Sequence, residues 1–360
     1  MQQGGGNDGR PYSFGRPSSG GSKAAYPCKS YGQGRINPAY FYGIFDPNDM
    51  RRDVSITMTG SNGKGVEKLI PFVPNSKAEG GGLTLNKWDE NRQANPWVAA
   101  QRKSGINGPY MRMSEVYLGY AEVCAALGDV VTGKQYLKTV RERSFPQGLA
   151  DTDGFIASFG NDLVRAIIEE RGFEYAGEGD RRWTLIRSGY LPEDIKRIKD
   201  MTKAMMDGLA TKGYYEFENG NIISAYIWTK LVDAKTIYGH RLTAQCPMDK
   251  VNDPVLYPGW RGQKDNWEEM GLNYGNSAPA TNLAIKGLFE IVSEEEAASL
   301  ESQGYAKVNW GIDLVDYRDE YDKYLFWDYD YVSAPIYLWP FTPNVMAAGG
   351  FTNGYGFKQE

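Results

Sequence analysis

The 360 residues include 40 lysines and arginines against 45 aspartates and glutamates, a net charge of −5, and they suffice for a sizeable hydrophobic core. No run of 18 apolar residues is present, so the sequence predicts no membrane-spanning helix. The sequence also lacks a basic stripe interleaved with aromatic residues, so nucleic acid is not favoured as a partner. The cysteines Cys28, Cys124 and Cys246 lie far apart in the sequence and lack metal-ligand spacing. One disulfide between two of them stays an open alternative.

Residues 1–34 are rich in glycine, serine and proline, which predicts a flexible segment. They contain neither the apolar core of a signal peptide nor a lipidation motif, and the context of Cys28 is not that of a lipid-bearing cysteine. Downstream, clusters of β-forming residues alternate with Gly, Pro and Asn. This pattern predicts short strands at 39–42, 54–58 and 69–73, joined by loops.

Apolar residues in 112–127 recur at spacings of three and four, which predicts a helix with one wide buried face. The predicted face consists of Met113, Val116, Tyr117, Tyr120, Ala121, Val123, Cys124 and Leu127. Gly128 is expected to end this helix, and a second helix over roughly 134–143 would complete a tetratricopeptide-type hairpin. One such hairpin cannot bury its own faces, so we expect it to pack on the rest of the chain or on a partner.

A third helix is predicted from 162 to about 176, with Asp162 as its N-cap. Two interpretations exist for the carboxylates of Glu170 and Glu174. They form an acid–base pair, or they belong to an ion-pair lattice that fixes the end of the helix. Arginines crowd this segment, and they would hold the acids ionised and occupied, which favours the lattice. These arginines are Arg171, Arg181 and Arg182.

The remaining elements follow from local signals. Apolar spacing predicts a helix over 192–209. The Asn-Gly step in 218–221 predicts a β-hairpin or an insertion within 214–230, and Ser293 followed by three glutamates predicts a capped helix over 293–303.

Few residues point to catalysis or to a bound metal. His240 is the only histidine, which excludes a Ser-His-Asp triad with a spare base and a histidine-rich metal site. The acids between 313 and 330 lack the spacing of a calcium loop, and the glycine triplets at 4–6 and 80–82 lack that of a phosphate loop, so we expect no cofactor. A carboxylate pair for glycoside hydrolysis depends on a separation in space, and that alternative stays open.

Aromatic residues make up 13% of the chain, with 25 tyrosines, 9 tryptophans and 14 phenylalanines. Flat rings stack on the apolar faces of sugars, while neighbouring amides and carboxylates bond the hydroxyl groups. Such a composition suits carbohydrate recognition. In the alternative interpretation, the rings fill a loop-rich core.

Three segments together carry a resemblance to a known family. They are PYMRMSEVYLGYAEVCAALGD at 109–129, LKTVRERSF at 137–145 and ERGFEYAGEGDRRWTLIRSGY at 170–190. They resemble the C-terminal signature of the SusD/RagB family. The segment FDPNDMRR at 45–52 resembles a further sequence motif of that family. Thr184 stands where the family often has Asp. Residues 337–341 and 353–356 resemble a degraded form of the family's closing motif.

Members of that family are nutrient-binding outer-membrane lipoproteins of Bacteroidetes. The resemblance implies a mostly α, SusD-like helical fold with long loops and minor short strands, in a single domain over 35–360. It implies the C-terminal portion of such a protein, without the N-terminal helical-repeat half. It also implies non-catalytic binding of a glycan or oligosaccharide at the outer-membrane surface, and delivery to a SusC-like TonB-dependent transporter. Membrane contact would come only through a lipid anchor, which this chain does not contain.

The resemblance places ligand contacts on aromatic residues outside the helical signature. The candidates are Tyr40, Tyr42, Trp88, Trp97, Trp260 and Trp267. Trp88 follows Lys87 in what resembles a family strand, so a structural role stays open for it. Two other functions also remain: a glycoside hydrolase and a helical-repeat interaction module. A glycan and a peptide both stay open as the ligand.

Overall fold

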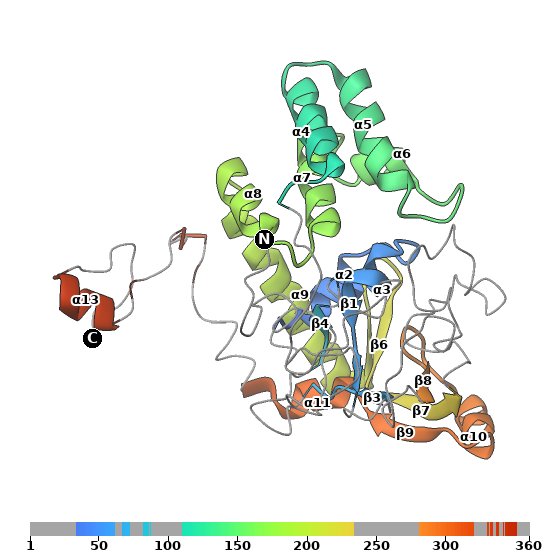
Figure 1. Ribbon diagram of the computed structural model, residues 1–360. Coiled ribbons are helices and arrows are strands. Elements are labelled where there is room, and N and C mark those ends of the chain that lie inside the picture. The colour runs from blue at the N-terminus through green and yellow to red at the C-terminus, as the bar shows by residue number, and fades with distance from the viewer. Residues whose placement is uncertain are drawn as a thin grey trace, which may run out of the picture.

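A computed structural model describes residues 34–61, 67–72, 82–85, 87, 110–233 and 281–319, together with 330, 332–333, 336–337, 341 and 343–350 (Figure 1). Most of its regular structure is helical, as predicted. The helices are α2 (Pro38–Gly43), α3 (Arg51–Ser55), α4 (Met113–Ala126), α5 (Val130–Glu142), α6 (Thr152–Ala157), α7 (Leu163–Glu174), α8 (Asp180–Ser188), α9 (Leu191–Lys212), α10 (Glu294–Ser302), α11 (Gly311–Asp316) and α13 (Pro343–Gly349).

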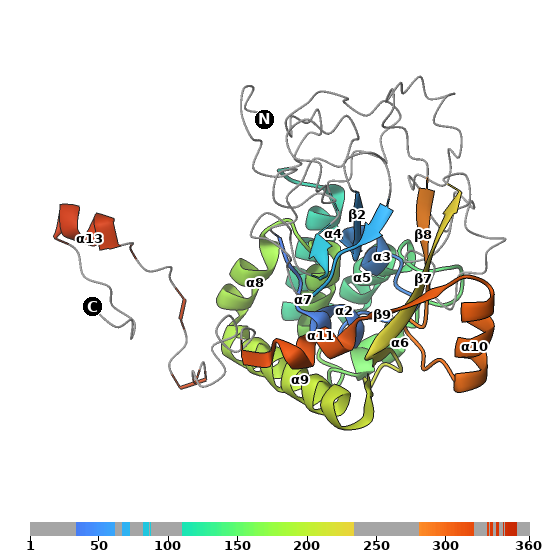
Figure 2. The same cartoon turned by 90° about the horizontal axis from the view of Figure 1, so that it is seen from below.

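The strands are short and form small antiparallel sheets. They are β1 (Ile56–Thr57), β2 (Thr59–Ser61), β3 (Glu67–Leu69), β4 (Thr84–Leu85), β5 (Tyr214–Glu216), β6 (Ile222–Ser224), β7 (Tyr226–Asp233), β8 (Thr281–Lys286) and β9 (Ala306–Asn309). The three-stranded sheet has the order β8-β7-β9, with Trp228 opposite both Lys286 and Lys307. Figure 2 shows this sheet with α10 on one side of the molecule and α8 on the other.

The helices α4 and α5 form the predicted hairpin, which packs on α7. Gly133 permits their close approach, because a Cβ there would lie 3.0 Å from the Ala121 carbonyl oxygen and 3.2 Å from the Leu163 side chain. Between α4, α5, α6 and α7 a separate hydrophobic cluster includes Leu118 and Leu137, both fully buried. Figure 1 shows the α4–α5 hairpin at one end of the molecule, with α7 beside it.

The main core lies between α2, α9 and the small sheets, and aromatic side chains fill much of it. Trp310 is completely buried, and its indole N–H donates to the Tyr42 hydroxyl at 2.8 Å. The Tyr42 ring stacks on Phe217 with centroids 6.0 Å apart. Pairing a buried indole with a hydroxyl satisfies both polar tips at once.

Several predicted elements are confirmed. The structure contains α7 with Asp162 as its N-cap, α9 over the predicted 192–209, α10 with Ser293 as its N-cap, and the β5–β6 hairpin. Gly128 ends α4 with a φ of 88°, in the left-handed region that favours glycine. The second helix of the hairpin begins earlier than predicted, at Val130, because the Asp129 carboxylate caps it by accepting from the Thr132 amide.

The strand predicted at 39–42 is wrong, because these residues form α2. Asn37 caps this helix by accepting a hydrogen bond from the Ala39 amide, and Pro38 occupies its first position. The aromatic residues that favour a strand locally are held in a helix by burial in the main core.

The predicted buried face of α4 is also largely wrong. The side chains that are buried belong to Ser114, Leu118, Ala121 and Cys124. The other side of the helix is exposed, with Met113 at 62%, Val116 at 50%, Tyr120 at 49%, Val123 at 54% and Leu127 at 82%. The helix is therefore apolar on two faces, and the described chain covers one of them.

The described helices include none that is long and apolar enough to cross a membrane. The predicted flexible segment 1–34 lies outside the described residues, apart from Gly34. Cys124 is a free, buried thiol, whereas Cys28, Cys246 and His240 lie outside the described part of the chain.

Candidate functional site

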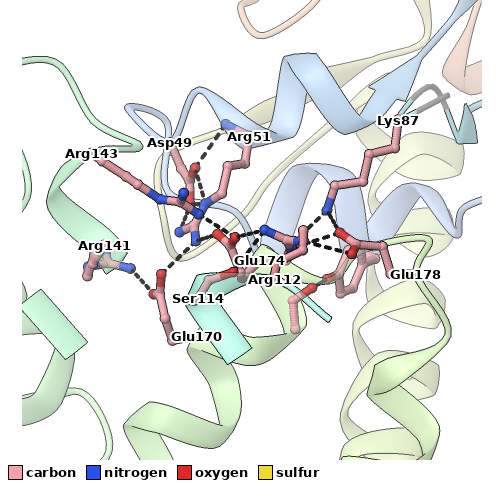
Figure 3. A network of polar contacts seen from close by, with 12 residues as sticks. Asp49, Arg51, Lys87, Arg112, Ser114, Arg141, Arg143, Glu170, Glu174 and Glu178 are labelled. Carbon is pink, nitrogen blue, oxygen red and sulfur yellow. Dashed lines mark hydrogen bonds and ion pairs between the residues drawn. The ribbon is translucent and has the colours of Figure 1, made fainter. Parts of the chain in front are cut away.

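Glu170 and Glu174, one turn apart on α7, lie at the centre of a buried ion-pair lattice (Figure 3). Glu170 has no exposed surface and accepts from the guanidinium groups of Arg51 at 2.6 Å and Arg141 at 3.0 Å. Glu174 accepts from Arg51 at 3.2 Å and Arg112 at 2.6 Å, and Arg143 also contacts it. The two carboxylates thus tie α7 to α3, to the start of α4 and to the end of α5.

The lattice continues from Arg112 to Glu178 and Lys87 (Figure 3). Arg112 donates to both carboxylate oxygens of Glu178 at 2.9 Å, and Lys87 contacts Glu178 at 2.5 Å. The Arg112 guanidinium also lies over the Tyr175 ring, 4.8 Å from its centroid. Burial lowers the pKa of Lys87, and Glu178 opposes that shift.

Two further groups of charges fix α7 against α8 and α9. Glu169 accepts from Arg181 at 3.0 Å and Arg197 at 3.1 Å, and both arginines also contact Asp194. Arg171 bonds Glu115 and Asp180, at 2.6 Å each. Arg182 donates to the Ile336 and Tyr337 carbonyls. All three arginines singled out in the sequence are thus engaged in the structure.

These contacts confirm the ion-pair lattice predicted for Glu170 and Glu174. Burial alone would raise the pKa of Glu174, but Arg51, Arg143 and Arg112 more than offset it and hold the pKa at about 2. A carboxylate that is ionised and bonded to three arginines has no proton to donate near neutral pH. Its arrangement suits a structural tie between four segments of the chain.

We expect Glu174 to make stability depend on pH between about 2 and 4.5. Its pKa is about 2 in the folded protein, whereas an unperturbed glutamate, as in the unfolded chain, has a pKa of 4.5. The stabilisation is therefore fully present above 4.5 and is lost as the pH falls toward 2. Urea unfolding at pH 6 and pH 3 should show a loss of about 2 kcal/mol from this group. Glu174→Gln should lack that part of the loss, whereas Glu142→Gln, on an exposed face, should keep the wild-type profile.

The structure describes two of the six predicted ligand-binding aromatic residues. Tyr42 is 0% exposed within the main core, so its ring offers no surface to a ligand. Tyr40 is half-buried, its hydroxyl donates to the Gly172 carbonyl at 2.9 Å, and burial raises its pKa. Both rings hold α2 in place. The remaining candidates lie outside the described residues; they are Trp88, Trp97, Trp260 and Trp267.

A cavity of about 910 Å³ lies between the end of α2, α6, α7, α9 and the β5–β6 hairpin. Aromatic side chains line it, and three of them are half-buried: Phe155, Phe159 and Tyr215. Phe155 meets Phe159 edge to face, with centroids 5.2 Å apart, and Tyr215 meets Phe217 in the same way at 4.8 Å. The cavity is therefore walled by rings that are fixed by their neighbours.

Polar and charged groups surround these rings. Asp46, Asp151 and Glu218 line the cavity, and exposed residues of α9 line it as well. Asn219 also lines it, but its side-chain amide donates to the Tyr42 and Phe45 carbonyls. Arg141 forms part of the wall, with its guanidinium 3.9 Å from the centroid of Phe155, and connects the cavity to the buried lattice. Fixed rings beside carboxylates are among the groups that suit sugar binding.

The sequence does not predict this cavity, because the residue types that favoured ligand contacts were tyrosine and tryptophan, whereas two of the three half-buried rings are phenylalanines. The available signal was the spacing of Phe155 and Phe159, four residues apart in a short polar segment that Asp151 caps. Nothing in the sequence brings them to the hairpin that carries Tyr215. Among the described residues, no group of three or more His, Cys, Asp or Glu side chains is placed to hold a metal ion.

Comparison with known proteins places these features in a family. A SusD-like protein of Formosa agariphila is 28% identical over 160 residues, which cover 44% of this chain and 26% of that protein. The crystal structure of a SusD homolog from Bacteroides thetaiotaomicron is similar at 23% identity with a TM-score of 0.32, over 45% of this chain and 33% of the other. The chain thus matches about a quarter to a third of these relatives. The family model described as "SusD family" matches residues 1–340, and the chain belongs to that family.

Proposed function

We propose that this chain takes part in nutrient capture by binding a glycan or oligosaccharide at the outer-membrane surface, without cleaving it. Membership of the SusD family supports this function. In the structure, the supporting observation is the cavity of about 910 Å³ in which fixed aromatic rings stand beside carboxylates. A pyranose ring presents an apolar face to such rings and hydroxyl groups to such polar atoms.

The proposal extends to delivery of the bound glycan to a SusC-like TonB-dependent transporter, with membrane attachment through a lipid anchor. The family relationship supports this step. Co-purification of the chain with a transporter of that class, with and without bound oligosaccharide, tests it. Recovery of the chain without any transporter in both conditions would contradict it.

Isothermal titration against neutral, amine-bearing and acidic polysaccharides tests the binding function, with reducing-end release measured in parallel. Saturable binding without release is the expected result. Turnover would instead indicate a glycoside hydrolase, and tight binding to a protein alone would indicate an interaction module. If no glycan binds under any condition, the proposal is contradicted for this chain.

Single aromatic substitutions should locate the binding site. Phe159→Ala in the cavity is expected to weaken glycan binding by about 1–3 kcal/mol, as for other aromatic anchors. Trp97→Ala and Trp260→Ala test two tryptophans chosen from the sequence, and a loss of binding in these variants without one in Phe159→Ala would place the site away from the cavity. Phe341→Ala is the control, because Phe341 is 50% exposed and does not line the cavity. Circular dichroism melts should show that each variant remains folded.

A further inference from the structure

Three carboxylates line the cavity without a cationic partner among the described residues. Asp46 and Asp151 each accept one backbone amide, from Asn48 and Gly154 respectively, both at 2.8 Å. Glu218, in the turn between β5 and β6, is exposed. In the described part of the chain, no lysine or arginine forms an ion pair with any of these three.

The cations that line the same cavity are already neutralised. Arg141 is 4% exposed and is bonded to Glu170 at 3.0 Å. Arg197 bonds Asp194 at 2.6 Å and Glu169 at 3.1 Å. Lys196 is paired with Asp200, one turn along α9. A ligand entering the cavity therefore meets uncompensated negative charge beside aromatic rings.

We infer that this cavity binds an amine-bearing oligosaccharide, one that contains 2-amino-2-deoxy sugar units; the inference rests on the carbohydrate-binding function proposed above. The sugar faces stack on the rings of Phe159 and Tyr215, and the ammonium groups pair with Asp151 and Glu218. Aromatic faces also attract cations, which adds to the preference for a protonated amine. Uronic and sulfated glycans are repelled by the same carboxylates.

The test compares two ligands of equal length that differ at the amine alone. Isothermal titration at about pH 6 uses a glucosamine oligomer, whose amines are protonated, and its fully N-acetylated counterpart. The glucosamine oligomer is expected to bind at least about tenfold more tightly, and its advantage should shrink in high salt because salt screens charge pairs. The neutral counterpart should show little dependence on salt.

Two variants remove the charge while keeping the shape of the cavity. Asp151→Asn retains the oxygen that caps α6, and Glu218→Gln alters an exposed turn residue. Each is expected to weaken binding of the glucosamine oligomer about three- to tenfold and to leave the N-acetylated oligomer within about twofold. Glu216→Gln is the matched control, because Glu216 is exposed on β5 and does not line the cavity.

Equal affinity for both oligomers, or variants that affect both equally, would overturn the preference for an amine while the carbohydrate-binding function stands. Tighter binding of a lysine-rich peptide than of the glucosamine oligomer would overturn the assignment to a sugar. If no glycan binds at all, the proposed function fails together with this inference. These outcomes separate the two claims.

Discussion

Replacing Glu170 with alanine should lower the free energy of unfolding by about 3–5 kcal/mol. Glu170 is fully buried and neutralises Arg51 and Arg141, whose side chains are 12% and 4% exposed. Without it, two guanidinium groups stay out of water with fewer partners. Chemical unfolding followed by circular dichroism measures the loss, and Glu170→Gln, which keeps the shape and an acceptor oxygen, should cost less.

The matched control is Glu142→Ala on α5. Glu142 is 48% exposed and pairs with Lys138 at 3.3 Å, one turn away on the same helix. A surface pair of this kind contributes less than about 1 kcal/mol. If Glu170→Ala and Glu142→Ala lowered stability equally, the buried lattice would contribute no more than a surface ion pair, and its proposed structural role would be wrong.

The sequence identified the members of this lattice on α7 but not all of their partners. The density of arginines and glutamates between 169 and 187 indicates ion pairing, because so many charges close together must be compensated. Arg51 lies 119 residues from Glu170, and no periodic pattern connects the two. The resemblance to the family includes both segments of the sequence. Their contact arises only from the packing of α3 on α7.

Predictions failed where tertiary contacts determined the outcome. The residues of α2 favour a strand locally, and their burial against α9 and the sheets holds them in a helix. Residue type favoured Tyr42 as a ligand contact, yet its ring fills the core, whereas the half-buried rings of the cavity are Phe155, Phe159 and Tyr215. The four tryptophans lie outside the described residues and stay predictions. Residue type predicts which chemistry is available, and the position in the fold decides which ring meets solvent.

Periodicity located α4, but most of the face that it predicted to be buried is exposed. Residues 113, 116, 120, 123 and 127 recur at alternating spacings of three and four, which is the pattern of a helix-packing seam. The described chain buries the other face, through Leu118, Ala121 and Cys124, against α5 and α7. The hairpin was expected to lean on the rest of the chain or on a partner, and it leans on the rest of the chain through this second face.

Substitutions on the two faces of α4 should therefore differ sharply. Leu118→Ala removes a fully buried side chain from the cluster between α4, α5 and α7, and should cost about 2–5 kcal/mol. Val116→Ala, on the face where Val116 is 50% exposed, should stay within about 0.5 kcal/mol of the wild type. Alanine also favours the helix more than valine does, which offsets part of any loss. Unfolding in urea measures both variants. A larger loss for Val116→Ala than for Leu118→Ala would mean that the seam predicted from the sequence is the buried face in solution, because removal of a methyl group costs stability only where neighbouring atoms surround it.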